Sequence, residues 1–167
     1  MTQNNRLGYV NTLHYRNKLT IIRGLPGSGK STYGRQLANQ TGAIFIEPDM
    51  FCMHRGEYHY TAQLYEDATK RALHLLHVAQ CDCIYADVLP TQNDVMRVYN
   101  SFFFGNYGCG SWDELRIVTL KITVEESLAK NIHHVAEDDI RRMAARWEPV
   151  LKEEVMRVSE CLLYEEI

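Results

Sequence analysis

The sequence predicts a three-layer α/β fold, in which a central parallel sheet is flanked by helices on both sides. Short apolar runs of strand length alternate with longer segments that carry apolar residues at helical spacing, and this alternation is typical of parallel sheets. A glycine-rich turn joins the first apolar run to the first helical segment. Acidic residues follow two of the later runs, which favours a functional site at one edge of the sheet.

The composition indicates one globular domain. The chain has 167 residues, of which 46% are hydrophobic, and a chain of this length buries roughly 70% of the surface of its unfolded form. The net charge of -3 and the isoelectric point of about 6.2 argue against a protein that coats nucleic acid, because such proteins present a broad basic face. Residues 1–17 are polar and are expected to form an N-terminal extension, followed by the domain at residues 18–167.

The cysteines and the hydropathy pattern predict a cytoplasmic protein. The five cysteines are scattered and odd in number, which indicates reduced thiols. No apolar run approaches the roughly 20 residues that a membrane-spanning helix needs, and the first residues lack the apolar centre of a signal peptide. We therefore expect no membrane partner.

The first half of the chain predicts three strands and two helices. Short apolar runs predict buried strands at residues 19–23, 43–46 and 83–86. Apolar residues at helical spacing predict helices over residues 30–40 and 61–79. Gly42 is expected to end the first of these helices.

Two capping patterns predict helix starts in the second half. Thr91 is followed three residues later by Asp94, which is a weaker form of the capping box. Thr123 and Glu126 form a stronger one, for a helix over residues 124–131.

The remaining pattern predicts one strand and two further helices. Residues 115–122 are expected to form the fourth strand, and residues 137–147 a helix that ends near Pro149. Apolar residues from 150 to about 163 are spaced for one helical face.

Parallel strands bring three distant positions together. Right-handed crossovers place the carboxyl ends of all strands at one edge of the sheet, where ligands of such sheets bind. Gly24, Asp49 and Asp87 each follow the end of a predicted strand. We expect them to share one cleft.

Residues 24–31 carry the complete pattern G-x-x-x-x-G-K-S between a strand and a helix, which predicts a phosphate-binding P-loop. Gly27 and Gly29 permit backbone angles that turn N–H groups toward phosphate oxygens, and the helix N-terminus adds positive charge. Lys30 is expected to reach the β- and γ-phosphates, and Ser31 to offer its hydroxyl to Mg²⁺. The full set of expected nucleotide contacts is Gly24, Pro26, Gly27, Ser28, Gly29, Lys30, Ser31 and Thr32.

The nucleotide is expected to be ATP with Mg²⁺, because the chain lacks the Asn-Lys-x-Asp pattern that reads guanine. Asp49 is the candidate that orients an acceptor hydroxyl and takes its proton, or it caps the loop beside Pro48. Asp87 is the candidate for the Mg²⁺ shell, with an acceptor contact or a turn role as alternatives. Glu47 is expected to point to the opposite face.

Phosphoryl transfer also needs cations that offset the charge of the moving group. The segment at about residues 124–147, the lid segment, supplies Lys130, Arg142 and Arg146, and the last two lie four residues apart on one expected helix face. These cations are expected to close over ATP, or they form a solvated face. The aromatic stretch at residues 56–61 either stacks on a base or sugar or packs between loop and helix.

The order of these elements resembles the phage-type polynucleotide 5′-kinase family and zeta-toxin-like ATP-binding proteins. The similarity covers roughly residues 18–147 and rests on the loop at residues 23–32, Asp49-Met50-Phe51, residues 56–60, Asp87, Lys130-Asn131 and residues 135–140.

The resemblance implies a P-loop kinase fold, ATP with Mg²⁺, and transfer of the γ-phosphate to a 5′-hydroxyl. Lys30, Ser31 and Asp49 match the family's motifs. The sequence departs from its pattern in three ways: Val88-Leu89 follow Asp87 where the family has Thr-Asn, Lys130 replaces the lid arginine, and Cys52 replaces another arginine.

Three functions fit these features. The first is an ATP-dependent kinase that acts on a hydroxyl, in particular a polynucleotide 5′-hydroxyl, with single-stranded 5′ ends as partners. The second is a small-molecule or nucleoside kinase of the same fold, which the changes after Asp87 and the acidic isoelectric point favour. The third is a weakly catalytic ATP-binding module, which the loss of the lid arginine favours.

Overall fold

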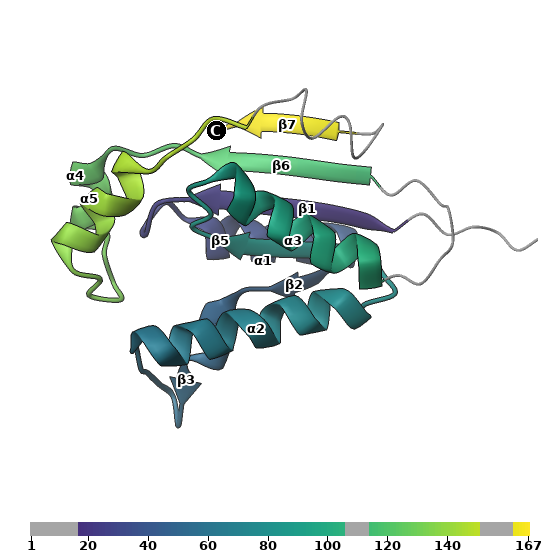
Figure 1. Cartoon of the computed structure of the whole chain (residues 1–167), viewed down its shortest axis with the longest axis horizontal. Helices are drawn as coiled ribbons and strands as arrows, with labels where there is room; N and C mark the ends of the chain where they lie inside the picture. The colour runs from purple at the N-terminus through teal and green to yellow at the C-terminus, as the bar shows by residue number, and fades with distance from the viewer. Residues whose placement is uncertain (1–16, 106–113, 151–161) are drawn as a thin grey trace, which may run out of the picture.

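A computed structural model describes residues 17–105, 114–150 and 162–167, and it confirms the predicted three-layer architecture (Figure 1). Five parallel strands form the central sheet in the order β2-β5-β1-β6-β7. The strands are β1 (Lys18–Gly24), β2 (Ile44–Ile46), β5 (Cys83–Asp87), β6 (Glu114–Leu120) and β7 (Leu162–Glu166). Because the strands are parallel, their carboxyl ends meet at one edge of the sheet.

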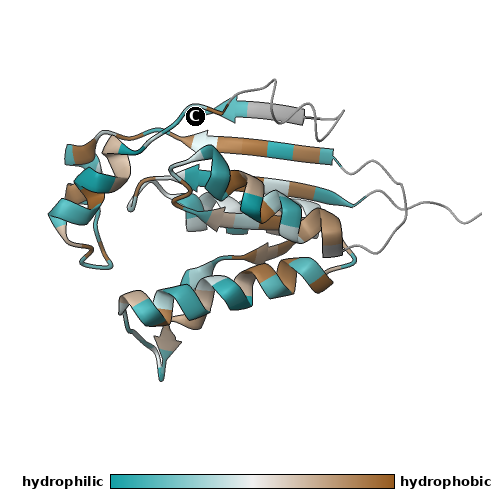
Figure 2. Ribbon diagram, viewed as in Figure 1, coloured by the Kyte–Doolittle hydropathy of each residue, from teal (hydrophilic) through white to brown (hydrophobic). Residues whose placement is uncertain are grey.

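Each face of the sheet has its own hydrophobic core, because side chains of a strand alternate between faces. Ile21, Tyr85 and Ile117 lie on the face that α2 (Ala62–Val78) and α3 (Gln92–Gly105) cover. The neighbouring strand positions pack on the opposite face, against α1 (Lys30–Thr41). Hydrophobic residues dominate the visible length of β6, whereas hydrophilic residues cover much of α5 (Glu137–Ala145) (Figure 2).

The predicted helix starts and stops are confirmed. Gly42 ends α1 with φ 76°, in the left-handed region that glycine tolerates. Thr91 Oγ1 accepts the N–H of Asp94 at the start of α3. Thr123 and Glu126 form a complete capping box at the start of α4 (Val124–Ala129).

Two strands differ from expectation. β2 is an edge strand rather than a buried one, and Ile44 is 50% exposed. At the other edge, residues 162–166 form β7 beside β6, where the sequence predicts the end of a helix; the rest of that predicted helix, residues 151–161, lies outside the described residues. Arg116 of β6 binds the carboxylate of Glu165 at 2.7 Å. Pairing with β6, rather than a local pattern, determines this strand.

A short irregular segment follows β2. The 3₁₀ helix η1 (Pro48–Phe51) leads into a hairpin of β3 (Met53–His54) and β4 (Glu57–Tyr58). This segment turns the chain back toward the sheet edge that carries the glycine loop, so Asp49 and Tyr58 come close to one another.

A fully buried arginine ties together three segments behind the glycine loop. Arg23, at the end of β1, is 0% exposed. Its guanidinium donates to the carbonyl oxygens of Pro90 and Glu148, both at 3.0 Å, and lies 4.2 Å from the centroid of the Trp147 ring. The segment that follows α5 is therefore fixed against the loop between β5 and α3.

Within the residues that the structure describes, no helix is both long and apolar enough to cross a bilayer.

We expect Arg23→Met to lower the free energy of unfolding by roughly 2–4 kcal/mol, because the buried guanidinium group and its two partly buried hydrogen bonds are lost. Urea denaturation followed by circular dichroism measures the change. The matched control is Arg71→Met on the exposed side of α2, for which the expected change stays within about 0.5 kcal/mol. Equal effects of the two substitutions would contradict the anchoring role of Arg23.

Candidate active site

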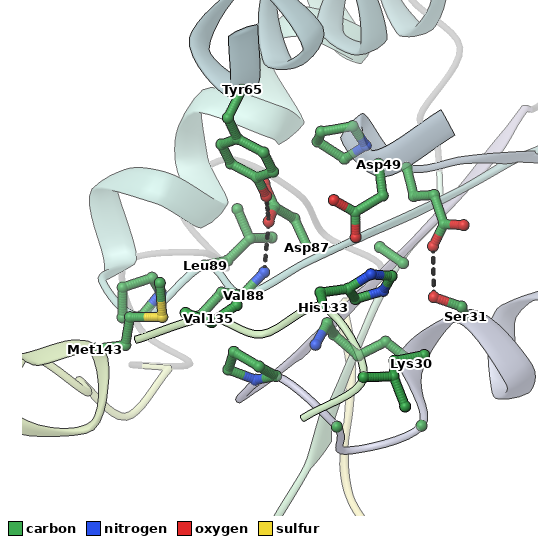
Figure 3. A pocket seen from close by; sticks show the side chains of 18 of the residues that line it. Lys30, Ser31, Asp49, Tyr65, Asp87, Val88, Leu89, His133, Val135 and Met143 are labelled. Atoms are coloured by element: carbon green, nitrogen blue, oxygen red, sulfur yellow. Dashed lines mark hydrogen bonds between the residues drawn. The ribbon is translucent and has the colours of Figure 1, made fainter. Parts of the chain in front are cut away.

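A pocket of about 480 Å³ lies at the carboxyl edge of the sheet, a volume typical of small-molecule sites. Its walls come from the glycine loop, the ends of β2 and β5, the start of α3 and the lid segment. Figure 3 shows Lys30, Asp49 and Asp87 facing this common space. Asp49 and Asp87 line one pocket as predicted, whereas Gly24 ends β1 at the same edge of the sheet and does not line it.

The glycine loop has the backbone geometry of an open anion cradle. Gly27 and Gly29 adopt φ values of 75° and 89°, which L side chains rarely take. No atom lies within 4 Å of a Cβ added at Gly29, so the space above this turn is free. The buried hydroxyl of Ser28 has no hydrogen-bond partner among the described residues. These features fit an anion that docks onto the loop.

The lid segment packs directly on this cradle. A Cβ at Gly27 would lie 2.9 Å from the Cβ of Lys130, so only glycine permits this close approach. The hydroxyl of Ser127, in α4, donates to the carbonyl of Pro26 at 2.6 Å. The first half of the lid segment is thus fixed to the loop.

Lys30 is a desolvated cation surrounded by acids. Its Nζ donates to the carbonyl of Leu25 at 2.9 Å. Burial lowers the pKa of Lys30 to about 8, although Asp87, Asp49 and Glu47 oppose this shift through their negative charge. A triphosphate that approaches the cradle would meet an ammonium group that has already lost much of its hydration.

Asp49 is oriented by an aromatic pair. The hydroxyl of Tyr58 donates to its carboxylate at 2.8 Å, and the ring of Tyr58 lies 4.4 Å from the ring of His133 in the lid segment. Desolvation, and then the charge of Asp49, raise the pKa of Tyr58, so this phenol stays protonated and keeps donating. In the aromatic stretch at residues 56–61, Tyr58 thus packs against the lid segment. Tyr58 and Tyr60 also line the pocket.

Asp87 is held by a second tyrosine. The hydroxyl of Tyr65 and the backbone N–H of Val88 both donate to Oδ1 of Asp87, the latter at 2.7 Å. Loss of hydration raises the pKa of Asp87, while these two bonds and Lys30 act in the opposite direction. Figure 3 shows Tyr65 reaching down from α2 to this carboxylate.

The expectation for Glu47 is wrong. It lines the pocket instead of pointing to the opposite face, and its carboxylate accepts from the Ser31 hydroxyl at 2.6 Å and from Arg35. The reason is that β2 ends at Ile46, and residue 47 caps η1 instead of continuing the alternation of the strand. An acid therefore contacts the hydroxyl that was predicted to bind Mg²⁺.

The structure separates the three predicted lid cations. Lys130 lines the pocket next to the cradle, and Arg146 lines it beyond α5. Arg142 does not line the pocket, because its guanidinium pairs with Asp139 one turn earlier. Among the predicted nucleotide contacts, the lining includes Pro26, Gly27, Gly29, Lys30, Ser31 and Thr32, whereas Gly24 and Ser28 support the loop from below.

Several pocket residues escaped the sequence analysis. Tyr65 lies on a helix face that the sequence assigns only to packing, and Arg97 lies on α3, which had no predicted role. The helical period of α3 could have found Arg97, because it lies one turn after the capping residue Asp94, and both line the pocket.

Sheet order, glycine loop and lid define a P-loop kinase-like fold, and comparisons with known proteins support this class. Residues 19–82 match the model of a family described as "AAA domain". A putative kinase from Chloroflexus aurantiacus superposes with a TM-score of 0.62 at 15% identity, covering 91% of this chain and 89% of that one. A gluconokinase from Sinorhizobium meliloti 1021 gives a TM-score of 0.53 at 15% identity, covering 92% of this chain and 85% of that chain.

A similar curated protein is an uncharacterized protein of Pasteurella multocida (strain Pm70), PM0531. It is 37% identical over 73 residues, which are 40% of this chain. The match spans 41% of that protein, less than half of its length.

The depressed pKa of Lys30 predicts a pH-dependent stability. An unfolded lysine keeps its proton up to about pH 10.5, whereas the folded one loses it near pH 8. Between these values the unfolded state binds more protons, so this group's contribution to stability rises with pH. The difference in free energy of unfolding between the wild type and Lys30→Met should shift in favour of the wild type by roughly 1–3 kcal/mol from pH 7.5 to 9.5.

Denaturation curves of both proteins at these two pH values measure the shift. Subtracting the variant removes the contribution of groups that titrate equally in both proteins. A difference that stays constant across this range would show that Lys30 is not desolvated.

Proposed function

We propose that this protein is an ATP-dependent kinase that transfers the γ-phosphate of ATP to a hydroxyl group of a small molecule. The observation that carries the proposal is the placement of Lys30, Asp49 and Asp87 around one pocket beside the glycine cradle. A cradle alone fits any nucleotide-binding protein. A carboxylate aimed into the same space supplies what a hydroxyl acceptor needs.

The cradle residues bind and neutralise the phosphates. Loop N–H groups at Gly27 and Gly29 donate hydrogen bonds to phosphate oxygens. The ammonium of Lys30 leaves the Leu25 carbonyl for the β- and γ-phosphates. Lys130, next to Gly27, adds a second positive charge at the same end of the pocket.

The donor set also fits Mg²⁺. In the described parts of the chain no group of three or more His, Cys, Asp or Glu side chains forms a metal cage, which agrees with the preference of Mg²⁺ for phosphate oxygens and water. The Ser31 hydroxyl with the carboxylates of Glu47 and Asp87 would hold the ion. When bound, Mg²⁺ offsets charge on the β- and γ-phosphates.

Asp49 acts on the acceptor. Its carboxylate, oriented by Tyr58, accepts a hydrogen bond from the acceptor hydroxyl and thereby aims the oxygen at the γ-phosphorus. The new O–P bond forms as the bond from the γ-phosphorus to the bridging oxygen breaks. That oxygen keeps the electron pair and leaves with ADP, and the hydroxyl proton passes to Asp49.

Three features support a small acceptor over the polynucleotide 5′-hydroxyl that the family resemblance implies. The pocket volume matches small ligands. The net charge of -3 offers little to a phosphate backbone. A gluconokinase is among the proteins of similar fold.

Asp49→Asn should lower the rate of transfer by about 100-fold or more and leave the affinity for ATP within about threefold. The amide keeps the shape of the carboxylate but cannot take the proton. Formation of ADP in a coupled assay measures the rate, with sugar acids, nucleosides and a 5′-hydroxyl oligonucleotide as acceptors. The matched control is Asp67→Asn on the exposed side of α2, which should leave both quantities unchanged.

Two outcomes would contradict the proposal. Transfer to the oligonucleotide alone would assign the acceptor to nucleic acid. Tight binding of ATP without transfer to any acceptor would identify a nucleotide-binding module with little catalysis.

A further inference from the structure

The pocket has a second end, opposite the cradle, whose residues take no part in the proposed phosphate contacts. It is built by the loop after β5, the first two turns of α3 and the residues around the end of α5. Figure 3 shows Val88, Leu89 and Met143 on this side, away from Ser31. The lining at this end comprises Val88, Leu89, Pro90, Asp94, Arg97, Met143 and Arg146.

Two arginines converge here from elements far apart in the sequence. Arg97 projects from the second turn of α3, and Arg146 follows the last residue of α5. The segment after Arg146 is docked on the start of α3, because the N–H of Glu148 donates to Pro90 at 2.8 Å and the N–H of Gln92 donates to the Glu148 carboxylate at 2.8 Å. These bonds bring the backbone after Arg146 to the start of α3, and the side chains of Arg97 and Arg146 both line the pocket.

Neither arginine has an acidic partner among the residues described. Their side chains make no ion pair within 4.0 Å in this part of the chain, whereas Arg141 and Arg142 of the same lid segment are both paired. Two unpaired guanidinium groups that line one pocket form a positive corner that attracts an anion.

The acid at this end already has donors of its own. Asp94 accepts from the N–H and the hydroxyl of Thr91 as part of the helix cap. This carboxylate is thus oriented by the helix cap rather than by Arg97 or Arg146.

The neighbouring wall is apolar and includes a strained residue. Leu89 adopts φ 47° although it is not glycine, and it is only 3% exposed. Such a conformation costs about 1–2 kcal/mol and persists because Leu89 packs in the core on the α3 side of the sheet. Leu89 therefore contributes apolar surface to this end, and the charged side chains that line it are Asp94, Arg97 and Arg146.

From this arrangement we infer that Arg97 and Arg146 bind an anionic group, a phosphate monoester or a carboxylate, carried by the acceptor, while the hydroxyl of the acceptor lies at Asp49. This inference rests on the proposed kinase function and names the class of its substrate as a small hydroxy compound with a negative charge. Planar guanidinium groups recognise an anion through the fixed directions of their N–H donors as well as through their charge.

Calorimetric titrations with the cradle saturated by Mg²⁺ and AMP-PNP, a non-hydrolysable ATP analogue, test the inference. The probes are inorganic phosphate and acetate, and the variants are Arg97→Gln, Arg146→Gln and the exposed control Arg71→Gln. We expect millimolar binding of at least one probe to the wild type and to the control. Each pocket variant should weaken it about tenfold or more, equivalent to about 1.4 kcal/mol, and Arg97→Gln should leave the affinity for AMP-PNP unchanged. Preference for phosphate would indicate a phosphorylated acceptor, and preference for acetate a carboxylic acid.

Three results would overturn the inference. If AMP-PNP binds but neither probe does, the anion site is absent while the proposed kinase function stands. If a probe binds equally well to both pocket variants, the anion lies elsewhere. If AMP-PNP itself fails to bind, the proposed function falls together with the inference.

Discussion

The burial of one ammonium group among carboxylates is the constraint on which the site depends. Lys30 has lost much of its hydration, and the charges of Asp87, Asp49 and Glu47 offset only part of that cost. Each of these acids is in turn held by a neutral or cationic donor, so the charges stay at fixed positions. The charged groups are therefore already oriented before a nucleotide binds. Such preorganised charges stabilise a transferring phosphoryl group most strongly.

The tyrosines give this cluster its rigidity. Tyr58 reaches Asp49 from the hairpin after β2, and Tyr65 reaches Asp87 from α2. The raised pKa values of both phenols keep them protonated. Two flexible acid side chains are thereby aimed by donors on separate elements, and each donor also packs as part of its own element.

The sequence predicted the parts of the site that depend on local pattern. The glycine loop, the capping boxes and the acids after β2 and β5 are all visible in a few consecutive residues. It failed where the outcome depends on distant partners: β7 exists because it pairs with β6, and Tyr65 is defined by an acid 22 residues away. The lid cations show the same limit. Arg142 and Arg146 lie four residues apart and are expected on one helix face, but only Arg142 has an acidic residue, Asp139, one turn earlier with which it forms an ion pair. The glycine motif between a strand and a helix predicted the turn at residues 24–31, whereas the residues after Asp87 depart from the pattern of the resembling family at Val88 and Leu89.

The lid segment is attached at two points. Ser127 joins its first helix to the carbonyl of Pro26, and Arg23 holds its far end through Glu148 and Trp147. Because both ends of the segment are bonded to the rest of the domain, we expect it to open by bending between these attachments rather than by moving as one body. The span between them contains α5 and His133, whose ring contacts Tyr58. Opening of the pocket is then expected to disturb the tyrosine that orients Asp49.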